Sequence, residues 1–465
     1  NVSGSLGFFL KCKEAGIKPI MGCELNLNDN IGKVDVGGEG GSSILKVIVK
    51  NKTGYVNLNK LLYLSHTDGF RSGESRITTD WLIENREGLM VSIGGHEGHV
   101  ADLIGKGRRT DAEGYILRLK KEFGDDLFAE IRFNALPEQK TLNEFVLVTA
   151  AEHDILTILD NDVHYVMPDG NLLQDTVYVI GQHGASLKKG AKLFDRRHLF
   201  YPNRKNYMEF NRQFSFFYPE NVLETFMDNS LALAERCSFE FEMGVEKYPK
   251  YEPTEDVVKY FGTDNVEEII YKMSDAKLRK KLNDREKRSG KVMTDEERKV
   301  YFDRLAYELD VIKSKKMLDY FLINWEILRH YRSKGFETGA ARGSCAGSLL
   351  AWVLDISKVD PLKYGLYFER FMNPTRNSVP DVDIDVQSGT DDVLDEFLYN
   401  KYGKNRILSV GTFSTFGEKV VLKDIVRVHM GAEFTGNESE VNQVTNEMPD
   451  IFKVEGTTLR RWLEE

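Results

Sequence analysis

Hydrophobic and polar positions follow two different periodicities along the first third of the chain. Short apolar runs flanked by glycine or polar residues predict buried β-strands, and apolar residues repeating every three to four positions predict helices between them. We expect strands at 18–21, 24–28, 44–49, 89–93, 127–131 and 155–159, and helices at 6–16, 56–65, 114–123 and 143–152. Strands that alternate with helices indicate an α/β layer or barrel.

The second part of the chain is mainly helical. Apolar stripes predict helices over 218–237 and from Thr294 onwards, where Thr294 and Glu297 form a capping-box pattern. Pro249 and Pro253 mark an extended linker that precedes the second of these helices.

A different alternation, at 380–386, places an aspartate at every other position. On a β-strand, Asp381, Asp383 and Asp385 share one face and the apolar residues between them share the other. Neighbouring carboxylates on that face lie about 6.6 Å apart, where two charges repel by roughly 2.5 kcal/mol at an effective dielectric constant near 20. A divalent cation such as Mg²⁺ offsets this repulsion, and a solvated edge strand is the alternative interpretation.

A run of small residues at 339–348 leads into an apolar segment. Such a run presents backbone N–H groups at a helix start, which suits a phosphate, and it equally permits close helix packing. Arg342 adds a forked donor, while Ser344 and Ser348 add hydroxyls. Asp381 follows Ser348 by 33 positions. Nucleotidyl transfer requires this pairing, because one element holds a triphosphate and the other holds two cations.

Composition and charge fit an ordinary globular protein. The 465 residues exceed what one core accommodates, so we expect two to four domains. With 63 basic and 73 acidic side chains the net charge is −10, which argues against a wholly basic nucleic-acid coat but allows a local basic channel. The four cysteines form no metal-type pair and indicate a reducing compartment. No apolar run is long enough to span a bilayer, so we expect a cytoplasmic protein.

Polar residues that could bind a metal follow several predicted strands of the first part. These are Glu24, His96, His99, Asp162 and His164. In α/β folds, sites form at the carboxyl ends of the strands. A lone histidine is more often a satisfied surface or core residue, so a structural role is the alternative.

Several segments resemble a known family. Residues 341–348, 360–364, 366–374 and 380–385 are similar to the palm of the bacterial replicative DNA polymerase III alpha subunits, which belong to the C family of polymerases. Residues 15–24, 54–58, 136–139 and 161–165 resemble that family's N-terminal PHP domain. The resemblance covers nearly the whole chain. It implies a multidomain α/β and α+β fold, in which a distorted (β/α) PHP barrel precedes a polymerase-β-like nucleotidyltransferase palm.

The same resemblance implies domain limits. They are a PHP domain at 1–190, a connecting helical region at 191–250, a palm at 251–430 and the start of a thumb at 431–465. The chain starts at Asn1 with a helical pattern and ends 82 positions after Asp383, whereas the family's third catalytic aspartate lies well over a hundred residues further on. We therefore expect a piece of a longer, phage-like reading frame that is inactive alone.

The resemblance also implies functions for residues of the palm. Asp381 and Asp383 match catalytic ligands of two Mg²⁺ ions, whereas Asp385 matches no catalytic position. The implied nucleotide- and phosphate-binding residues are Arg342, Gly343, Ser344, Ser348, Arg370 and Arg376. Weaker candidates for DNA contact are Lys419, Lys423 and Arg427.

The implied activity is template-directed addition of deoxynucleoside triphosphates to a primer 3′ end. Primed DNA, a sliding clamp and other replisome subunits would be the partners, with no membrane involved. In the PHP part, Glu24, Asp162 and His164 match vestigial metal positions, but Gly95 and Asn134 stand where ligands are common, so we expect no competent metal site there. A PHP-type phosphoesterase or 3′–5′ exonuclease, and a non-catalytic DNA-binding subunit, are the alternatives.

Overall fold

The computed structural model falls into two compact units, residues 1–242 with 413–465 (unit 1) and residues 243–412 (unit 2). The domain limits expected from the sequence remain predictions. The structure describes residues 2–31, 42–134, 136–182, 186–187, 198–244, 248–373, 380–407, 411–412, 417–431, 439 and 442–443.

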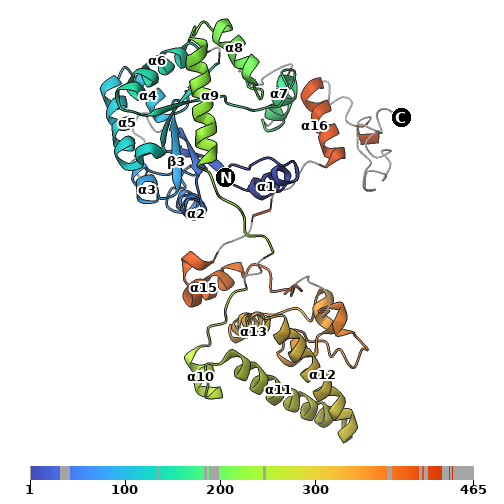
Figure 1. The fold of residues 1–465 in the computed structure, drawn as a ribbon. Coiled ribbons are helices and arrows are strands. Elements are labelled where there is room, and N and C mark those ends of the chain that lie inside the picture. Colours follow the sequence, from blue (N-terminus) through green and yellow to red (C-terminus); the bar gives the residue numbers. More distant parts are fainter. Residues whose placement is uncertain are drawn as a thin grey trace. The chain divides into compact units, whose positions relative to one another are not determined.

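Unit 1 is built on a mixed sheet of five strands in the order β1-β2-β3-β4-β5 (Figure 1). The strands are β1 (Gly22–Leu27), β2 (Ser43–Val49), β3 (Leu89–Ile93), β4 (Leu127–Arg132) and β5 (Leu156–Asp160). β1, β2 and β3 pair antiparallel, and β3, β4 and β5 pair parallel. The predicted α/β character is confirmed, while closure of the sheet into a barrel stays a prediction.

One predicted strand does not form. Residues 18–21 have no strand assignment, although the Met21 carbonyl accepts a hydrogen bond of 2.8 Å from the Val49 N–H. The segment has the apolar character of a strand, but β1 begins only at Gly22. The apolar run at 18–21 therefore predicted that the chain joins the sheet near this point, but it did not predict the residue at which strand pairing begins.

Helices cover both faces of the sheet. Alternate strand residues Met90, Phe128 and Ile158 pack with Leu233 of α9 (Glu220–Glu235), and their sequence neighbours on the other face join the main core. That core also takes in buried residues of α2 (Lys52–His66) and α5 (Arg109–Phe123). The remaining α-helices of unit 1 are α1 (Ser5–Glu14), α3 (Thr79–Glu84), α4 (His99–Gly105), α6 (Pro137–Glu152), α7 (Asn171–Ile180), α8 (Arg204–Gln213) and α16 (Glu418–Met430), with the short η1 (Gly124–Asp126).

Unit 2 is helical in the part that the structure describes. Its α-helices are α10 (Glu255–Phe261), α11 (Val266–Ser289), α12 (Asp295–Ser314), α13 (Leu318–Ser333), α14 (Leu349–Val353) and α15 (Asp391–Tyr402), with the short helices η2 (Gly343–Gly347), η3 (Phe368–Arg370) and η4 (Lys404–Arg406). The predicted capping box is confirmed, since Thr294 and Glu297 exchange hydrogen bonds at the start of α12. The palm sheet is not assigned within these residues, where the β pairing is the isolated bridge between Thr338 and Val386.

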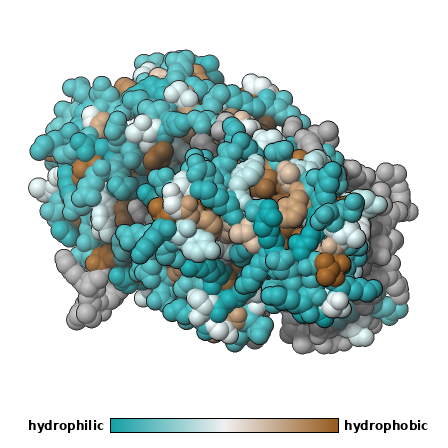
Figure 2. Space-filling model, turned by 90° about the horizontal axis from the view of Figure 1, so that it is seen from below, coloured by the Kyte–Doolittle hydropathy of each residue, from teal (hydrophilic) through white to brown (hydrophobic). Residues whose placement is uncertain are grey.

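The surface seen in Figure 2 is mostly hydrophilic, and its apolar side chains lie in small separate groups. None of the described helices combines the length and the apolar character that crossing a bilayer requires.

Two glycines of unit 1 give opposite predictions for substitution by alanine. A Cβ on Gly54, near the start of α2, would lie 1.8 Å from the Gly88 carbonyl oxygen. A Cβ on Gly114, which is exposed within α5, would meet nothing within 4 Å. We expect Gly54→Ala to lower the free energy of unfolding by about 1–3 kcal/mol through overpacking, and Gly114→Ala to raise it by about 0.5–1 kcal/mol. Urea denaturation of the 465-residue chain measures both changes, and equal midpoints for the two variants would contradict this packing.

Candidate functional site

Two segments singled out from the sequence lie side by side in unit 2. They are residues 339–348, called here the Gly-Ser loop, and residues 380–386, called the acidic segment. The Gly339 N–H donates a hydrogen bond of 2.8 Å to the Asp385 carbonyl, and an isolated antiparallel bridge flanks this bond. A Cβ on Gly339 would lie 2.9 Å from the Asp385 Cβ, so glycine permits this close approach. The predicted pairing of a small-residue loop with an acidic segment is thus present in the structure.

The alternation predicted for the acidic segment is confirmed. Asp381, Asp383 and Asp385 are exposed, whereas Val382 and Ile384 are half buried and pack against the core of unit 2. The three carboxylates therefore share an outward face. No strand is assigned here, because the isolated bridge is the only ladder contact that the described residues give this segment.

A residue of α13 holds the backbone of the acidic segment. The Val382 N–H, between the first two aspartates, donates a hydrogen bond of 3.1 Å to the hydroxyl of Tyr320. Tyr320 is itself packed against the apolar core of unit 2. The backbone that carries Asp381 and Asp383 is therefore fixed by a helix, which matters for any ligand those carboxylates hold.

Arg342 of the Gly-Ser loop faces the acidic segment. Its guanidinium donates a hydrogen bond of 3.0 Å to Asp385 Oδ1, and the Asp383 Oδ2 lies 3.5 Å from the place a Cβ would take on Gly343. The hydrogen bond to Asp385, followed by the charges of Asp385 and Asp383, raises the pKa of Arg342. The positive charge of Arg342 in the loop therefore interacts directly with the negative charges of Asp383 and Asp385.

Ser348, at the end of the loop, has a different environment from the one expected. It is fully buried, its hydroxyl donates a hydrogen bond of 2.9 Å to Glu308, and its oxygen accepts one of 3.1 Å from the Ala351 N–H. The N–H groups of Leu349 and Leu350 also donate to Glu308. A carboxylate of the protein thus occupies the helix start where the sequence predicted a phosphate. Phosphate binding by Ser348 stays a prediction, but its hydroxyl is engaged internally here.

Glu308 was not identified from the sequence. It lies on α12 among the apolar stripe residues, is fully buried, and also accepts a hydrogen bond of 2.7 Å from Arg304. Arg304 in turn donates to the Gly347 carbonyl at 3.1 Å. Burial raises the pKa of Glu308, and burial together with the charges of Glu308 and Asp383 raises the pKa of the Cys345 thiol to about 12. A single charged residue within an apolar stripe was the available signal.

The other predicted nucleotide-binding residues are less well defined by the structure. Gly343 is exposed and Ser344 is half buried at the start of η2, and Arg370 is exposed at the end of η3. Arg376 lies outside the described residues. Gly343 has a positive φ of 61°, a backbone conformation in which glycine is favoured.

The three weaker DNA-contact candidates belong to α16 in unit 1. The side chain of Lys419 is outside the described part, and Lys423 is half buried. Arg427 donates a hydrogen bond of 3.4 Å to the Ile180 carbonyl at the end of α7 and pairs with Asp424. In this structure Arg427 therefore helps to dock α16 on α7, and a role in DNA contact stays a prediction.

A second group of charges lies on β2, β4 and β5 of unit 1, close to the ends of β4 and β5. We call Lys46, Glu130, Arg132 and Asp160 the strand-end charge network. Glu130 pairs with Arg132 at 2.6 Å and with Lys46 at 3.3 Å, and both cations also pair with Asp160. Burial acts to raise the pKa of Glu130, but the positive charges of Arg132 and Lys46 outweigh burial and hold this pKa well below its ordinary value. Two carboxylates are thus neutralised by two internal cations.

The absence of a side chain at Gly95 leaves room for the guanidinium of Arg132. A Cβ on Gly95 would lie 2.9 Å from a guanidinium nitrogen of Arg132 and 3.1 Å from Glu130 Oε1. Gly95 is the position at which the sequence lacked an expected metal ligand, and Asn134, the other such position, is buried with its side chain accepting a bond from the Leu136 N–H. The guanidinium therefore lies against the position of the missing ligand.

The remaining candidate ligands do not complete a metal site. Burial raises the pKa of Glu24. Burial also acts to raise the pKa of Asp162, but the hydrogen bond with His164 outweighs it and lowers that pKa to about 2. His96 has both ring nitrogens buried without a hydrogen-bond partner, and its Nε2 lies 3.6 Å from Glu97. These residues do not bring three ligand atoms together, and neighbouring cations already compensate the charge. The absence of a competent metal centre in unit 1 stays a prediction.

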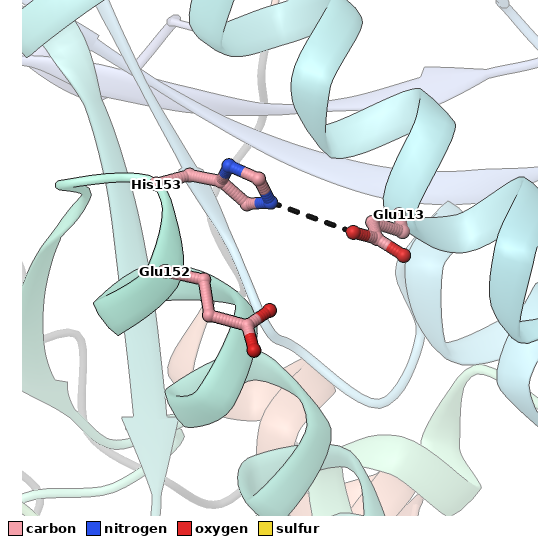
Figure 3. A group of neighbouring side chains, drawn as sticks. All are labelled: Glu113, Glu152 and His153. Carbon is pink, nitrogen blue, oxygen red and sulfur yellow. Dashed lines mark hydrogen bonds and ion pairs between the residues drawn. The ribbon is translucent and has the colours of Figure 1, made fainter.

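Among the described residues, one group does bring three possible ligand atoms within 4.8 Å of one another (Figure 3). Glu113 lies on α5, Glu152 ends α6, and His153 follows it, with its Nε2 3.4 Å from Glu113 Oε1. None of the three was singled out from the sequence. Exposed carboxylates often gather without a bound ion, so this group by itself carries no assignment.

Comparisons with known proteins agree with the two-part organisation. A family model described as the PHP domain matches residues 1–133, and one described as the bacterial DNA polymerase III alpha NTPase domain matches residues 254–465.

Curated relatives are similar over most of the chain. The DNA polymerase III subunit alpha of Borreliella burgdorferi is 32% identical over 468 residues, which cover 98% of this chain and 37% of the relative. The subunits of the same name from Caulobacter vibrioides and Bacillus subtilis are 29% and 30% identical, covering 92% and 91% of this chain and 35% and 34% of their own lengths. The chain thus spans little more than a third of the length of these relatives.

The strand-end charge network predicts that the stability of unit 1 does not depend on a metal. Arg132→Met would leave the buried Glu130 and the half-buried Asp160 with one cation, so we expect the free energy of unfolding to fall by about 3–5 kcal/mol. The matched control is Arg118→Met, which removes a half-exposed arginine paired with Asp80 and should cost about 1 kcal/mol or less. Thermal unfolding of the 465-residue chain should be unchanged by a chelator. A midpoint lowered by chelation would contradict the network's role.

Glu308 gives a second stability prediction. Glu308→Ala would leave Ser348, two backbone N–H groups and Arg304 without their buried acceptor, so we expect a loss of about 3–5 kcal/mol. Glu296→Ala, at an exposed position in the first turn of the same helix, should change stability by less than about 1 kcal/mol. Urea denaturation measures both variants, and similar midpoints would show that Glu308 does not hold the loop.

Proposed function

Because the chain belongs to the family of bacterial DNA polymerase III alpha subunits, we propose that it forms part of a template-directed DNA polymerase. In this proposal unit 2 contributes the nucleotide-binding loop and the first carboxylates of the polymerase site. Unit 1 contributes a PHP domain that is held together without a metal.

The observation that carries the proposal is the contact between the Gly-Ser loop and the acidic segment. A loop that carries the exposed Arg342 and the half-buried Ser344 lies against an exposed face of three aspartates, fixed by the bond between Gly339 and Asp385. One element suits phosphate oxygens and the other suits hard cations. Nucleotidyl transfer needs both at the same place.

The donor chemistry fits Mg²⁺, which takes carboxylate oxygens and shares its shell with substrate phosphates. Asp381 and Asp383 would hold it, because both are exposed, lie on one face and have a backbone fixed by Tyr320. When bound, Mg²⁺ makes the primer 3′ hydroxyl more acidic and neutralises the departing pyrophosphate.

The chain's own residues would bind and orient the nucleotide. Arg342 and the hydroxyl of Ser344 would donate hydrogen bonds to the triphosphate, and Arg370 and Arg376 would add positive charge around it. The 3′ oxygen of the primer then forms a bond to the α-phosphorus as the bond to pyrophosphate breaks. Positioning and charge stabilisation supply most of the rate in such a transfer.

Several further parts of the proposal follow from the family. Primed DNA and deoxynucleoside triphosphates are the substrates, a sliding clamp and other replisome subunits are the partners, and the compartment is the cytoplasm. Lys419, Lys423 and Arg427 would contact DNA. A metal-dependent phosphoesterase or exonuclease in unit 1 is disfavoured, because Lys46 and Arg132 already neutralise Glu130 and Asp160 there.

Primer extension tests this function in the complete natural polypeptide that carries these residues. We expect Mg²⁺-dependent extension of a primed template, and a loss of about 10³-fold in rate for Asp383→Asn, because a metal ligand supplies several kcal/mol to the transition state. Asp391→Asn, at an exposed position of α15, is the matched control and should keep the wild-type rate. Absence of Mg²⁺-dependent synthesis by the wild type, or full activity of Asp383→Asn, would refute the proposal.

A further inference from the structure

We infer that Asp385 competes with the incoming nucleotide for Arg342: Asp385 pairs with Arg342 in the nucleotide-free protein, and Arg342 exchanges this carboxylate for a phosphate of the nucleotide. The inference rests on the proposed function. It gives a role to the third aspartate of the segment, to which the family resemblance assigns none.

The position of Asp385 is fixed by its backbone. Its carbonyl accepts the Gly339 N–H at 2.8 Å, and the next residue, Val386, pairs with Thr338 in the isolated bridge. A Cβ on Gly339 would come within 2.9 Å of the Asp385 Cβ, so the two backbones touch. The Asp385 carboxylate therefore starts from a defined place, directly opposite the entry to the Gly-Ser loop.

The loop entry is held from a second side. The Lys358 N–H donates a hydrogen bond to the Ala340 carbonyl, and the Lys358 ammonium donates one to the Thr338 carbonyl. Residues 338–340 are thus fixed between Lys358 and Asp385. Arg342 follows two residues later, so the base of its side chain has little freedom while its guanidinium can still move.

The ion pair itself is suited to exchange. The side chains of Arg342 and Asp385 are 62% and 53% exposed, and an ion pair in water is weak because both ions keep most of their hydration. A triphosphate carries more charge than one carboxylate and accepts a bidentate guanidinium, so it competes well for Arg342. The pair keeps the guanidinium near the site without binding it too tightly to release.

The charge of Asp385 should weaken nucleotide binding, because the nucleotide has to displace Asp385 from Arg342. In the free protein Arg342 compensates Asp385, and a bound nucleotide must take Arg342 away from that carboxylate. Asp385 therefore competes with the nucleotide, and removing its charge should strengthen nucleotide binding. A merely structural role for Asp385 predicts the opposite, since a disturbed loop would bind the nucleotide less well.

Steady-state primer extension by the complete natural polypeptide tests the competition. We expect Asp385→Asn to lower the KM for deoxynucleoside triphosphate by about two- to fivefold, the range that exposed ion pairs produce, with kcat changed by less than about twofold. Arg342→Gln should raise the KM by about tenfold or more. In the Arg342→Gln background at 0.15 M salt, Asp385→Asn should lower the KM by less than it does in the wild type, because competition for Arg342 is gone and only repulsion weakened by salt remains.

A matched control is present on α11. Arg279 and Asp275 form an ion pair with side chains 62% and 50% exposed, nearly the same as the Arg342–Asp385 pair. Asp275→Asn should leave KM and kcat unchanged, and Asp385→Ser should lower the KM as Asp385→Asn does. The inference is overturned if Asp385→Asn raises the KM, or if it lowers the KM equally with and without Arg342. A wild type without Mg²⁺-dependent extension removes the proposed function and this inference together, whereas an active wild type that is insensitive at Asp385 removes the inference alone.

Discussion

Repulsion between carboxylates constrains both units of this protein. In unit 1, Glu130 is buried and Asp160 is half buried on neighbouring parallel strands, where water screens their charges little. Lys46 and Arg132 lie between them, and a serine hydroxyl completes the bonding of Glu130. The two cations lower the cost of burying Glu130 among its neighbouring carboxylates.

Unit 2 treats the same repulsion differently. Its three aspartates alternate with half-buried apolar residues and face outwards, where water lowers the cost of gathering them. Arg342 is near, but it is exposed and carries one charge against three. Negative charge therefore remains on this face, and a cation from solution is the natural complement. The two units thus differ in where their carboxylates lie: beside internal cations in unit 1, and on an open face in unit 2.

Local patterns predicted much of this architecture. Five of the six strands expected in the first part formed, and the one at 18–21 failed because apolar character does not fix where a strand finds its partner. The strand expected at 380–386 is not assigned either, since its pairing is limited to an isolated bridge. The alternation of the aspartates was predicted correctly, since it follows from the two-residue period alone. Glu308 beneath Ser348, and Arg132 beside Gly95, could not be predicted, because each contact joins residues about 40 positions apart through a fold that short-range patterns do not specify.

Arg132 and Gly95 also have a consequence for how this chain can change. A larger side chain at residue 95 would push the guanidinium away from Glu130 and Asp160, and removing Arg132 would leave those two carboxylates with Lys46 as their shared cation. Either single step costs stability before any metal affinity is gained. Residues 95 and 132 are therefore coupled, so a larger side chain at position 95 requires a compensating change at position 132.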